Sequence, residues 1–268
     1  MTTSAVAGEL VETATTVARS AGAMLMDRLA APRTLTAKST PTDMVTEVDA
    51  AAEKLIVSLL RRRRPDDGVL GEEGTATEGT TGLRWVIDPI DGTTNYMYRT
   101  AAFSVSVAVQ DSAGTVVGVV YDPQRDELFC GTRGVGATRN GQAIRVNQAS
   151  DLSQALVATG FAYDAGRRKR QAQVLVDVIA QVRDIRRSGS AAVDWCSLAC
   201  GRVDALYERG QQPWDHAAGA LIAREAGAVV GDLRGGAPSA EMAFGAVPGI
   251  FEPLRELLAG LEADRDQD

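Results

Sequence analysis

Acidic residues occur at three places where an apolar run of the sequence ends: segments 70–73 (LGEE), 87–91 (IDPID) and 214–215 (WD). Carboxylates beside buried apolar segments are costly unless they are paired with a cation or bind a metal. None of the three segments contains a lysine or an arginine, so positive charge must come from elsewhere. Mg²⁺ supplies two positive charges and prefers oxygen ligands. We therefore expect these carboxylates to meet at a metal site.

The turn after the second acidic segment has residues that suit a phosphate group. Pro89 stiffens the chain, so the two aspartates of segment 87–91 bracket a turn and point into one pocket, with the Ile90 carbonyl also available. Gly92 lets the backbone approach a ligand closely. If Thr93 begins a helical turn, the free amides and the helix dipole favour an anion. A metal on one side and amides on the other would hold a phosphate ester; the alternative is a capped surface turn.

The composition narrows the possible functions. The length of 268 residues predicts one large domain or two closely packed halves. The net charge of −7 argues against nucleic-acid binding. A single histidine, His216, excludes multi-histidine metal sites and is expected to be a packing residue. Three cysteines without a framework spacing indicate reduced thiols and a cytoplasmic setting, and neither a signal peptide nor a membrane span is expected.

Hydrophobic periodicity and turn residues predict a chain of two sub-halves, 1–145 and 146–268, with a boundary near 141–150. The first is expected to hold two long helices and an antiparallel meander, and the second alternates strands with helices. Helices are expected at 4–30, 46–64, 168–182, 190–200, 214–226 and 250–260. Strands are expected at 69–70, 85–88, 103–109, 115–121, 127–131, 156–159, 185–187, 205–208 and 242–245, with loops at 33–43 and 75–82. The strict alternation of 103–109 predicts a strand with one buried face.

Three stretches of this chain resemble the inositol monophosphatase family of Mg²⁺-dependent, lithium-sensitive phosphatases. They are GEE (71–73), WVIDPIDGTTNY (85–96) and WDHAAGALIAREAG (214–227), and the two longer stretches look like the family's two signature motifs in the right order. The resemblance begins near Lys38 and reaches the final helix. It implies a single unit over residues 1–268, an α/β (α+β) fold in the form of a five-layered αβαβα sandwich, two or three Mg²⁺ per subunit, and a homodimer.

The resemblance also implies roles for individual residues. The metal ligands are Glu72, Asp88, the Ile90 carbonyl, Asp91 and Asp215. The catalytic residues are Asp49 and Thr93, which orient the attacking water together with Glu72. The substrate-binding residues are Asp91, Gly92, Thr93, Gly189, Ser190, Ala191, Glu208 and Asp215, of which Gly92 and Thr93 hold the phosphate. Two further candidates are Glu73, expected to lie behind Glu72, and Lys38, which either reaches the phosphate or is simply solvated.

Several of these residues have a plainer interpretation when the resemblance is set aside. Thr93 serves equally well as a helix cap, and Asp49 as an acid that offsets the dipole of the helix it begins. Glu208 is equally compatible with a surface acid. The basic run 167–170 is expected to be a solvated helix start; the alternative is a position near the cleft that attracts an anionic substrate.

The resemblance implies hydrolysis of inositol monophosphate to myo-inositol and phosphate by a metal-activated water. Fructose-1,6-bisphosphatase activity is the first alternative, decided by the pocket rim around Tyr163, Arg186 and Ser190. Histidinol phosphate, another small sugar phosphate or 3′-phosphoadenosine are further substrate alternatives. An alternative of another class is a regulatory partner in an RNA-related assembly. The expected partner is a small phosphorylated polyol, with neither nucleic acid nor membrane.

Overall fold

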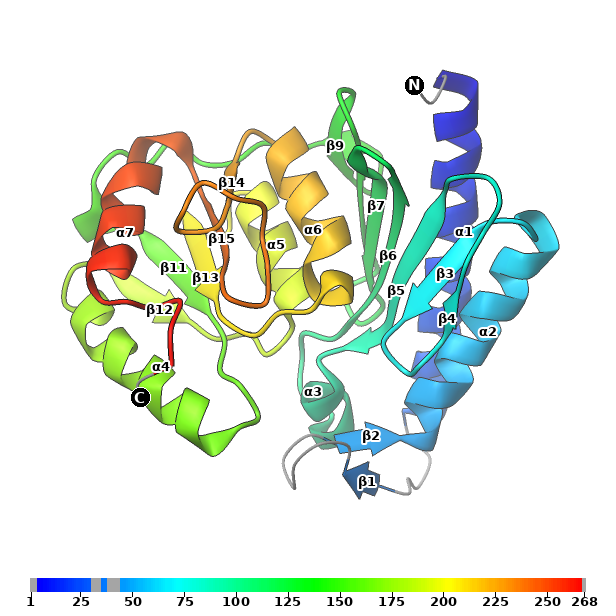
Figure 1. Ribbon diagram of the computed structural model, residues 1–268, viewed down its shortest axis with the longest axis horizontal. Coiled ribbons are helices and arrows are strands. Elements are labelled where there is room, and N and C mark those ends of the chain that lie inside the picture. The colour runs from blue at the N-terminus through cyan, green and yellow to red at the C-terminus, as the bar shows by residue number, and fades with distance from the viewer. Residues whose placement is uncertain (1–3, 30–34, 38–43, 267–268) are drawn as a thin grey trace.

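An eight-stranded sheet carries the first two acidic segments at the ends of its strands (Figure 1). The computed structural model describes residues 4–29, 35–37 and 44–266. The strands, in order across the sheet, are β10 (Gln142–Ala143), β9 (Gly136–Arg139), β8 (Glu127–Thr132), β7 (Gly114–Asp122), β6 (Ser104–Asp111), β5 (Arg84–Asp91), β3 (Gly68–Gly71) and β4 (Ala76–Thr77). β3 and β5 pair in parallel, and the run from β5 to β10 pairs antiparallel, which confirms the predicted meander.

A second sheet of five strands lies in the other half of the molecule. Its order is β12 (Asp184–Arg186), β11 (Leu156–Thr159), β13 (Ala205–Glu208), β15 (Ala243–Ala246) and β14 (Val229–Gly231). β11 pairs in parallel with both neighbours, whereas β15 pairs antiparallel with both of its own. A separate antiparallel pair joins β1 (Leu35–Ala37) and β2 (Met44–Thr46).

Helices cover both faces of each sheet and make five alternating layers, as Figure 1 shows. The helices are α1 (Ser4–Arg28), α2 (Glu47–Arg63), α3 (Thr93–Tyr98), α4 (Ala165–Ile179), α5 (Ala191–Ala199), α6 (Pro213–Glu225) and α7 (Pro248–Gly260). α1 and α2 pack on the outer face of the eight-stranded sheet, α5 and α6 lie between the sheets, and α7 packs on the second sheet and against α4. The predicted αβαβα sandwich is therefore confirmed. The division into two sub-halves stays a prediction, because α6 contacts strands of both sheets.

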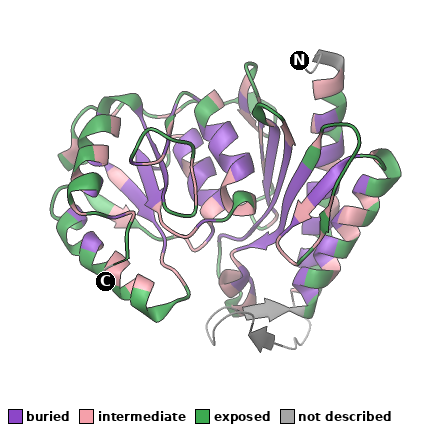
Figure 2. Ribbon diagram, viewed as in Figure 1, coloured by how far each residue is buried: buried purple, intermediate pink, exposed green. Residues whose placement is uncertain are grey.

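The expectation of one buried face for strand 103–109 is wrong, because both faces of β6 are buried. Its three valines pack in the core under α1, which explains the alternation in the sequence. The other face meets α6, and Ser106 there donates a hydrogen bond to the Trp214 carbonyl at 3.1 Å. Ser104 lies within 3.4 Å of the Asp91 carboxylate. The polar face of β6 is thus directed at the centre of the molecule, where Figure 2 shows buried strands, and not at solvent.

Other elements differ from the expectation mainly in short segments. The predicted loops at 33–43 and 75–82 contain the short strands β1 and β4, although 38–43 lie outside the described residues. β2, β9, β10 and β14 were not predicted, and α3 was predicted only as a possible turn. These elements have two to six residues, too few for a periodic pattern to be visible. None of the helices in the described part of the chain is long and apolar enough to cross a membrane.

Candidate metal centre and active site

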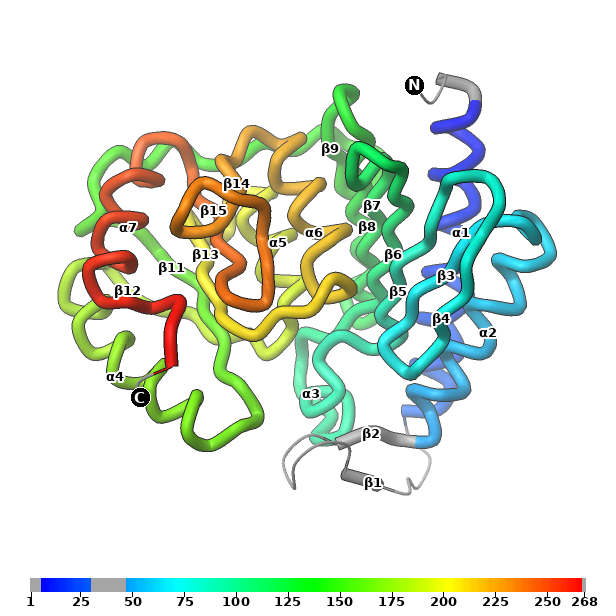
Figure 3. The backbone as a smooth tube through the Cα atoms, viewed as in Figure 1, coloured from blue at the N-terminus to red at the C-terminus, as the bar shows by residue number. Residues whose placement is uncertain are grey.

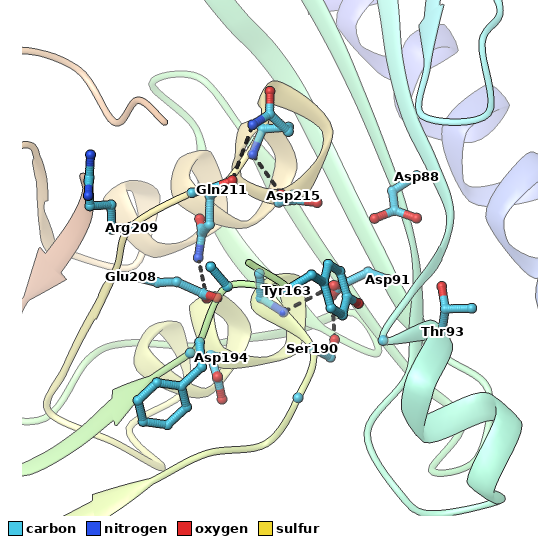
Figure 4. Close-up of a pocket in the computed structure, with 18 of the residues that line it drawn as sticks. Asp88, Asp91, Thr93, Tyr163, Ser190, Asp194, Glu208, Arg209, Gln211 and Asp215 are labelled. Carbon is cyan, nitrogen blue, oxygen red and sulfur yellow. Dashed lines mark hydrogen bonds between the residues drawn. The ribbon is translucent and has the colours of Figure 1, made fainter. Parts of the chain in front are cut away.

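Three aspartates from two elements meet in one pocket. Asp88 and Asp91 lie near the end of β5, Asp215 lies in the first turn of α6, and one carboxylate oxygen of each is within 4.8 Å of the others. Asp88 and Asp91 are buried, and Asp215 is half-buried. Figure 4 shows the three side chains around a common space. The structure therefore brings together acids from two of the three acidic segments.

The prediction of a turn between Asp88 and Asp91 is wrong, because strand β5 continues through Pro89 to Asp91. Residues three apart on a regular strand point to opposite faces. The register between β5 and β6 shifts between Asp88 and Asp91, and this irregularity lets both side chains point to the same pocket. Asp88 is held by the amide of Ile90, whose nitrogen is 2.9 Å from Oδ1.

Glu72 reaches the same pocket from the neighbouring strand. β3 and β5 run in parallel with Gly71 opposite Ile87, so the residues that follow, Glu72 and Asp88, lie side by side at the end of β3. The Glu72 amide donates to the Ile87 carbonyl at 3.2 Å. Glu72 is not one of the three acids of the tight cluster, but its negative charge contributes to the raised pKa of Asp88.

Crowding of like charges in a buried place changes the ionisation of these acids. Burial, and next the charge of Glu72, raise the pKa of Asp88 well above the usual value for a carboxyl. Burial raises the pKa of Asp91 to about 6, although hydrogen bonds from Ser190 and the α5 amides oppose the rise. Burial and then the charge of Asp91 raise the pKa of Asp215. A divalent cation with a preference for oxygen ligands fits this donor set, because it relieves both the burial cost and the repulsion.

Asp91 is also bound to the N-terminus of α5. Its carboxylate accepts hydrogen bonds from the amides of Ala191 and Ala192 at 3.1 and 2.7 Å, and from the Ser190 hydroxyl. Ser190 and Ala191 line the pocket, as predicted for substrate-binding residues, but both already contact Asp91. Asp215 is fixed in a similar way by the Gln212 amide at 2.6 Å.

Thr93 and Asp49 form a buried pair next to the acids. The Thr93 hydroxyl lies 3.1 Å from Asp49 Oδ1 and 3.0 Å from the Ile90 carbonyl, and both residues are almost completely buried. Asp49 lies in the first turn of α2, as the dipole interpretation expects, and it is also buried against Thr93. The interpretation of Thr93 as a helix cap is wrong, because Thr93 is the first residue of α3 and the N-cap is Gly92.

Two glycines allow the backbone to pass close to the pocket. Gly92 has φ of 94° and Gly189 has φ of 92°, a region that residues with a Cβ rarely adopt. A Cβ on Gly92 would lie 3.1 Å from the Gly189 carbonyl, so the two loops touch. Asn95 ties them together by donating to the carbonyls of Ala102 and Ser188 at 2.6 and 2.8 Å.

Glu53 positions the loop that carries Glu72 and was missed in the sequence. Its buried carboxylate accepts hydrogen bonds from the Glu73 amide at 2.8 Å, and from the Thr75 amide and hydroxyl at 3.0 and 2.6 Å. Glu53 lies on α2 among alternating polar and apolar residues, where an acid gives no signal of its own. Glu73 does not line the pocket; Lys38 lies outside the described residues.

The pocket has a volume of about 440 Å³ and extends from the acids to the end of β13. Glu208 lies there with Gln211, whose side-chain amide donates to it at 3.0 Å and also accepts from the Trp195 indole. Burial raises the pKa of Glu208. Tyr163 lies in the lining, as expected for a rim residue.

One rim residue was assigned wrongly. Arg186 does not line the pocket; it forms an exposed ion pair with Asp184 at 2.6 Å, and its neighbour Arg187 lines the pocket instead. The direction of a side chain at the end of a short strand depends on the register, which sequence alone does not define. Asp194 and Arg209 also line the pocket and were not singled out.

The structure also gives the positions of the basic run, the histidine and the cysteines discussed from the sequence. Arg167 from the basic run lines the pocket, so the alternative position near the cleft is correct for this residue. His216 is half-buried, and burial lowers its pKa to about 4. All three cysteines are free thiols, and burial raises the pKa of each.

The sequence profile of the inositol monophosphatase family matches residues 7–267. The chain belongs to this family. The match spans almost the whole sequence, so both sheets and all the acidic segments belong to the family unit.

Similar proteins of known name agree with this assignment. The Inositol-1-monophosphatase SuhB of Mycobacterium tuberculosis (strain ATCC 25618 / H37Rv) is 44% identical over 238 residues, which cover 84% of this chain and 80% of that protein. The Nus factor SuhB of Escherichia coli (strain K12) is 42% identical over 233 residues, covering 85% and 86%. Among solved structures, the extragenic suppressor protein suhB from Bartonella henselae superposes with a TM-score of 0.88 at 34% identity, covering 93% of this chain and 98% of that one.

Proposed function

We propose that the protein is a Mg²⁺-dependent phosphoric monoester hydrolase that converts inositol monophosphate to myo-inositol and phosphate. The observation that carries the proposal is the meeting of Asp88, Asp91 and Asp215 beside the buried Thr93–Asp49 pair in a single pocket. Family membership and the inositol monophosphatase names of relatives support the same activity.

Two or three Mg²⁺ would be held by Glu72, Asp88, Asp91, Asp215 and the Ile90 carbonyl. That carbonyl lies 3.0 Å from the Thr93 hydroxyl, and its lone pairs are available to a metal when the Thr93 proton points to Asp49. When bound, Mg²⁺ lowers the pKa of a water and neutralises charge on the phosphate and the leaving oxygen. The carboxylates keep their positions because backbone amides hold Asp88, Asp91 and Asp215.

Thr93 and Asp49 would take the proton from the attacking water. Thr93 donates its single hydroxyl proton to Asp49 and leaves its own lone pairs free to accept from the water. As the water attacks phosphorus in line, its proton moves to Thr93 and the Thr93 proton moves to Asp49. The amides of Gly92 and Thr93 hold the phosphoryl oxygens, and no covalent phospho-enzyme is required.

The far wall of the pocket would bind the polyol. Glu208 accepts hydrogen bonds from substrate hydroxyls, while Gln211 holds the other oxygen of the same carboxylate. Gly189, Ser190 and Ala191 complete this wall. Hydrogen bonds to several hydroxyls distinguish a polyol from an apolar alcohol, because an unmatched buried polar group is costly.

Fructose 1,6-bisphosphate and other small sugar or histidinol phosphates are the alternative substrates, since the same metal ligands serve any phosphate monoester. A second candidate of another class is a regulatory role in an RNA-related assembly. It is favoured by one observation, the name Nus factor SuhB of the Escherichia coli relative. The lithium sensitivity, the homodimer and the cytoplasmic setting belong to the proposal through the family resemblance, and the free cysteines support a reducing compartment.

Phosphate release from inositol 1-phosphate with and without Mg²⁺, repeated with Li⁺, tests the proposal. Asp88→Asn is expected to abolish the Mg²⁺-dependent release while the far-ultraviolet circular dichroism stays unchanged. Asp177→Asn is the matched control, because Asp177 is exposed on α4 and lines none of this pocket. Near-normal turnover of Asp88→Asn would end the proposal, and absence of all turnover in the wild type would favour the regulatory role.

A further inference from the structure

The chain places one of its own carboxylates on two arginines of the pocket. Arg167, in the first turn of α4, and Arg209, directly after β13, both line the pocket and both bind Asp266. Arg209 donates through both terminal nitrogens to the two oxygens of Asp266, with 3.0 Å between Nη2 and Oδ2. The Arg167 Nη2 lies 3.4 Å from the same Oδ2. A forked arginine on a carboxylate is the geometry that also binds phosphate.

These arginines offer more donors than Asp266 uses. Within the described part of the chain, the buried Nε atoms of Arg167, Arg170 and Arg209 have no hydrogen-bond partner. The third arginine, Arg170, instead donates its terminal nitrogen to the carbonyls of Leu261 and Glu262. A dianionic phosphate has three terminal oxygens and about twice the charge of a carboxylate, so it would use donors that Asp266 leaves unsatisfied.

The arginines lie at the far end of the pocket from the catalytic residues. Figure 4 places Arg209 across the pocket from Asp88 and Thr93, with Asp215 between them. A smaller cavity of about 280 Å³ shares Asp164 and Arg167 with the pocket and is also lined by Asp266. A substrate held at the catalytic end by one phosphate would therefore extend a second group toward the arginines.

We propose that Arg167 and Arg209 form a second anion subsite, which Asp266 occupies and which the second phosphate of a polyol bisphosphate takes over. The inference rests on the proposed function and deepens it, because it names the bisphosphate class and the internal competitor. Asp266 lies after α7, outside the helices and strands, so its displacement breaks no regular structure; Figure 3 follows this segment from α7 past α4. Its side chain is 52% exposed and can return to water, whereas the Arg209 side chain is only 11% exposed and needs an anion in place of Asp266.

Asp266→Asn in the full chain tests the subsite, with fructose 1,6-bisphosphate and inositol 1-phosphate as probes. We expect the KM for the bisphosphate to fall by about 5-fold, as expected for removal of a weak competing ion pair. The KM for inositol 1-phosphate stays unchanged, because it has no second phosphate. The matched control is Asp264→Asn, which removes an ion pair of the same segment with Arg234, 2.7 Å away and outside the pocket.

Arg209→Gln added to Asp266→Asn is expected to remove the gain for the bisphosphate. The inference is overturned if Asp266→Asn leaves the ratio of the two KM values as it is in the wild type. It is also overturned if Asp266→Asn and the control Asp264→Asn lower the KM for the bisphosphate equally. Failure of the proposed function is seen separately, as absence of turnover of inositol 1-phosphate by the wild type. In that case, calorimetric titration of fructose 1,6-bisphosphate into Asp88→Asn with and without Asp266→Asn still measures the subsite.

Discussion

Replacing Asp215 by asparagine is expected to stabilise the metal-free protein and to remove its stabilisation by Mg²⁺. The three clustered carboxylates lie within 4.8 Å of one another. Two unit charges at that separation repel by about 3.5 kcal/mol at an effective dielectric constant near 20. Partial protonation relieves some of this repulsion, because the pKa of Asp215 is raised. We therefore expect a gain of about 2–3 kcal/mol, while the asparagine oxygen still accepts from the Gln212 amide.

The stability of the metal-free protein is also expected to depend on pH through Asp91. Burial, its largest cause, raises the pKa of Asp91 from 3.8 to about 6, which corresponds to about 3 kcal/mol. Between these two values the folded state binds more protons than the unfolded state, so the stability of the metal-free protein falls as the pH rises through that window. The pKa of Asp215 is also raised, so the gain from Asp215→Asn is expected to be largest at high pH, where Asp215 is charged, and to vanish at low pH, where it is protonated.

Thermal unfolding in EDTA and in saturating Mg²⁺ measures both effects. At roughly 2–4 °C per kcal/mol, the metal-free variant is expected to melt about 4–12 °C above the wild type. Mg²⁺ raises the Tm of the wild type by mass action and leaves the variant nearly unchanged. Asp151→Asn is the control, because this exposed N-cap aspartate has an equally good cap as replacement. The reasoning is refuted if Asp215→Asn is no more stable than the wild type in EDTA at pH 8, or if Mg²⁺ stabilises both equally.

Two further substitutions test the supports of the site. Glu53→Gln replaces a carboxylate that accepts three hydrogen bonds by an amide with one acceptor oxygen. We expect the variant to bind Mg²⁺ about 10-fold more weakly, as measured by calorimetry. Glu47→Gln, at an exposed position of the same helix, is the control and is expected to have no effect. Burial alone would raise the pKa of Asp67, but hydrogen bonds from the Arg64 guanidinium, a threonine hydroxyl and an indole N–H lower it overall. Asp67→Asn is expected to lower the free energy of unfolding in urea by about 2–3 kcal/mol at pH 7. This difference from the wild type shrinks as the pH falls below about 4, because protonation of Asp67 removes the same stabilisation. An equal loss of stability in Asp66→Asn, at an exposed position, would contradict this reasoning.

The long elements, and the acids that meet in the pocket, were predictable from the sequence. Helices such as α6 and strands such as β7 repeat their apolar residues over many positions, and the turns between them use glycine, proline and aspartate. Acids at the ends of apolar runs, without a nearby basic residue, predicted a divalent metal because burial of unpaired charge is costly. The family resemblance predicted the layers, and the family profile matches residues 7–267.

Only the tertiary structure decided which side chains meet. The irregular pairing of β5 points Asp88 and Asp91 to one side, and the packing of α6 between the sheets brings Asp215 to them. The same packing brings the Ser190 hydroxyl to Asp91 and places Arg187, instead of Arg186, in the pocket. It also brings the carboxylate of Glu53 to Thr75 and that of Asp266 to Arg209. Periodicity and turn chemistry depend on residues close in the chain, whereas these contacts depend on strand register and on how the layers stack, which neighbouring residues do not encode.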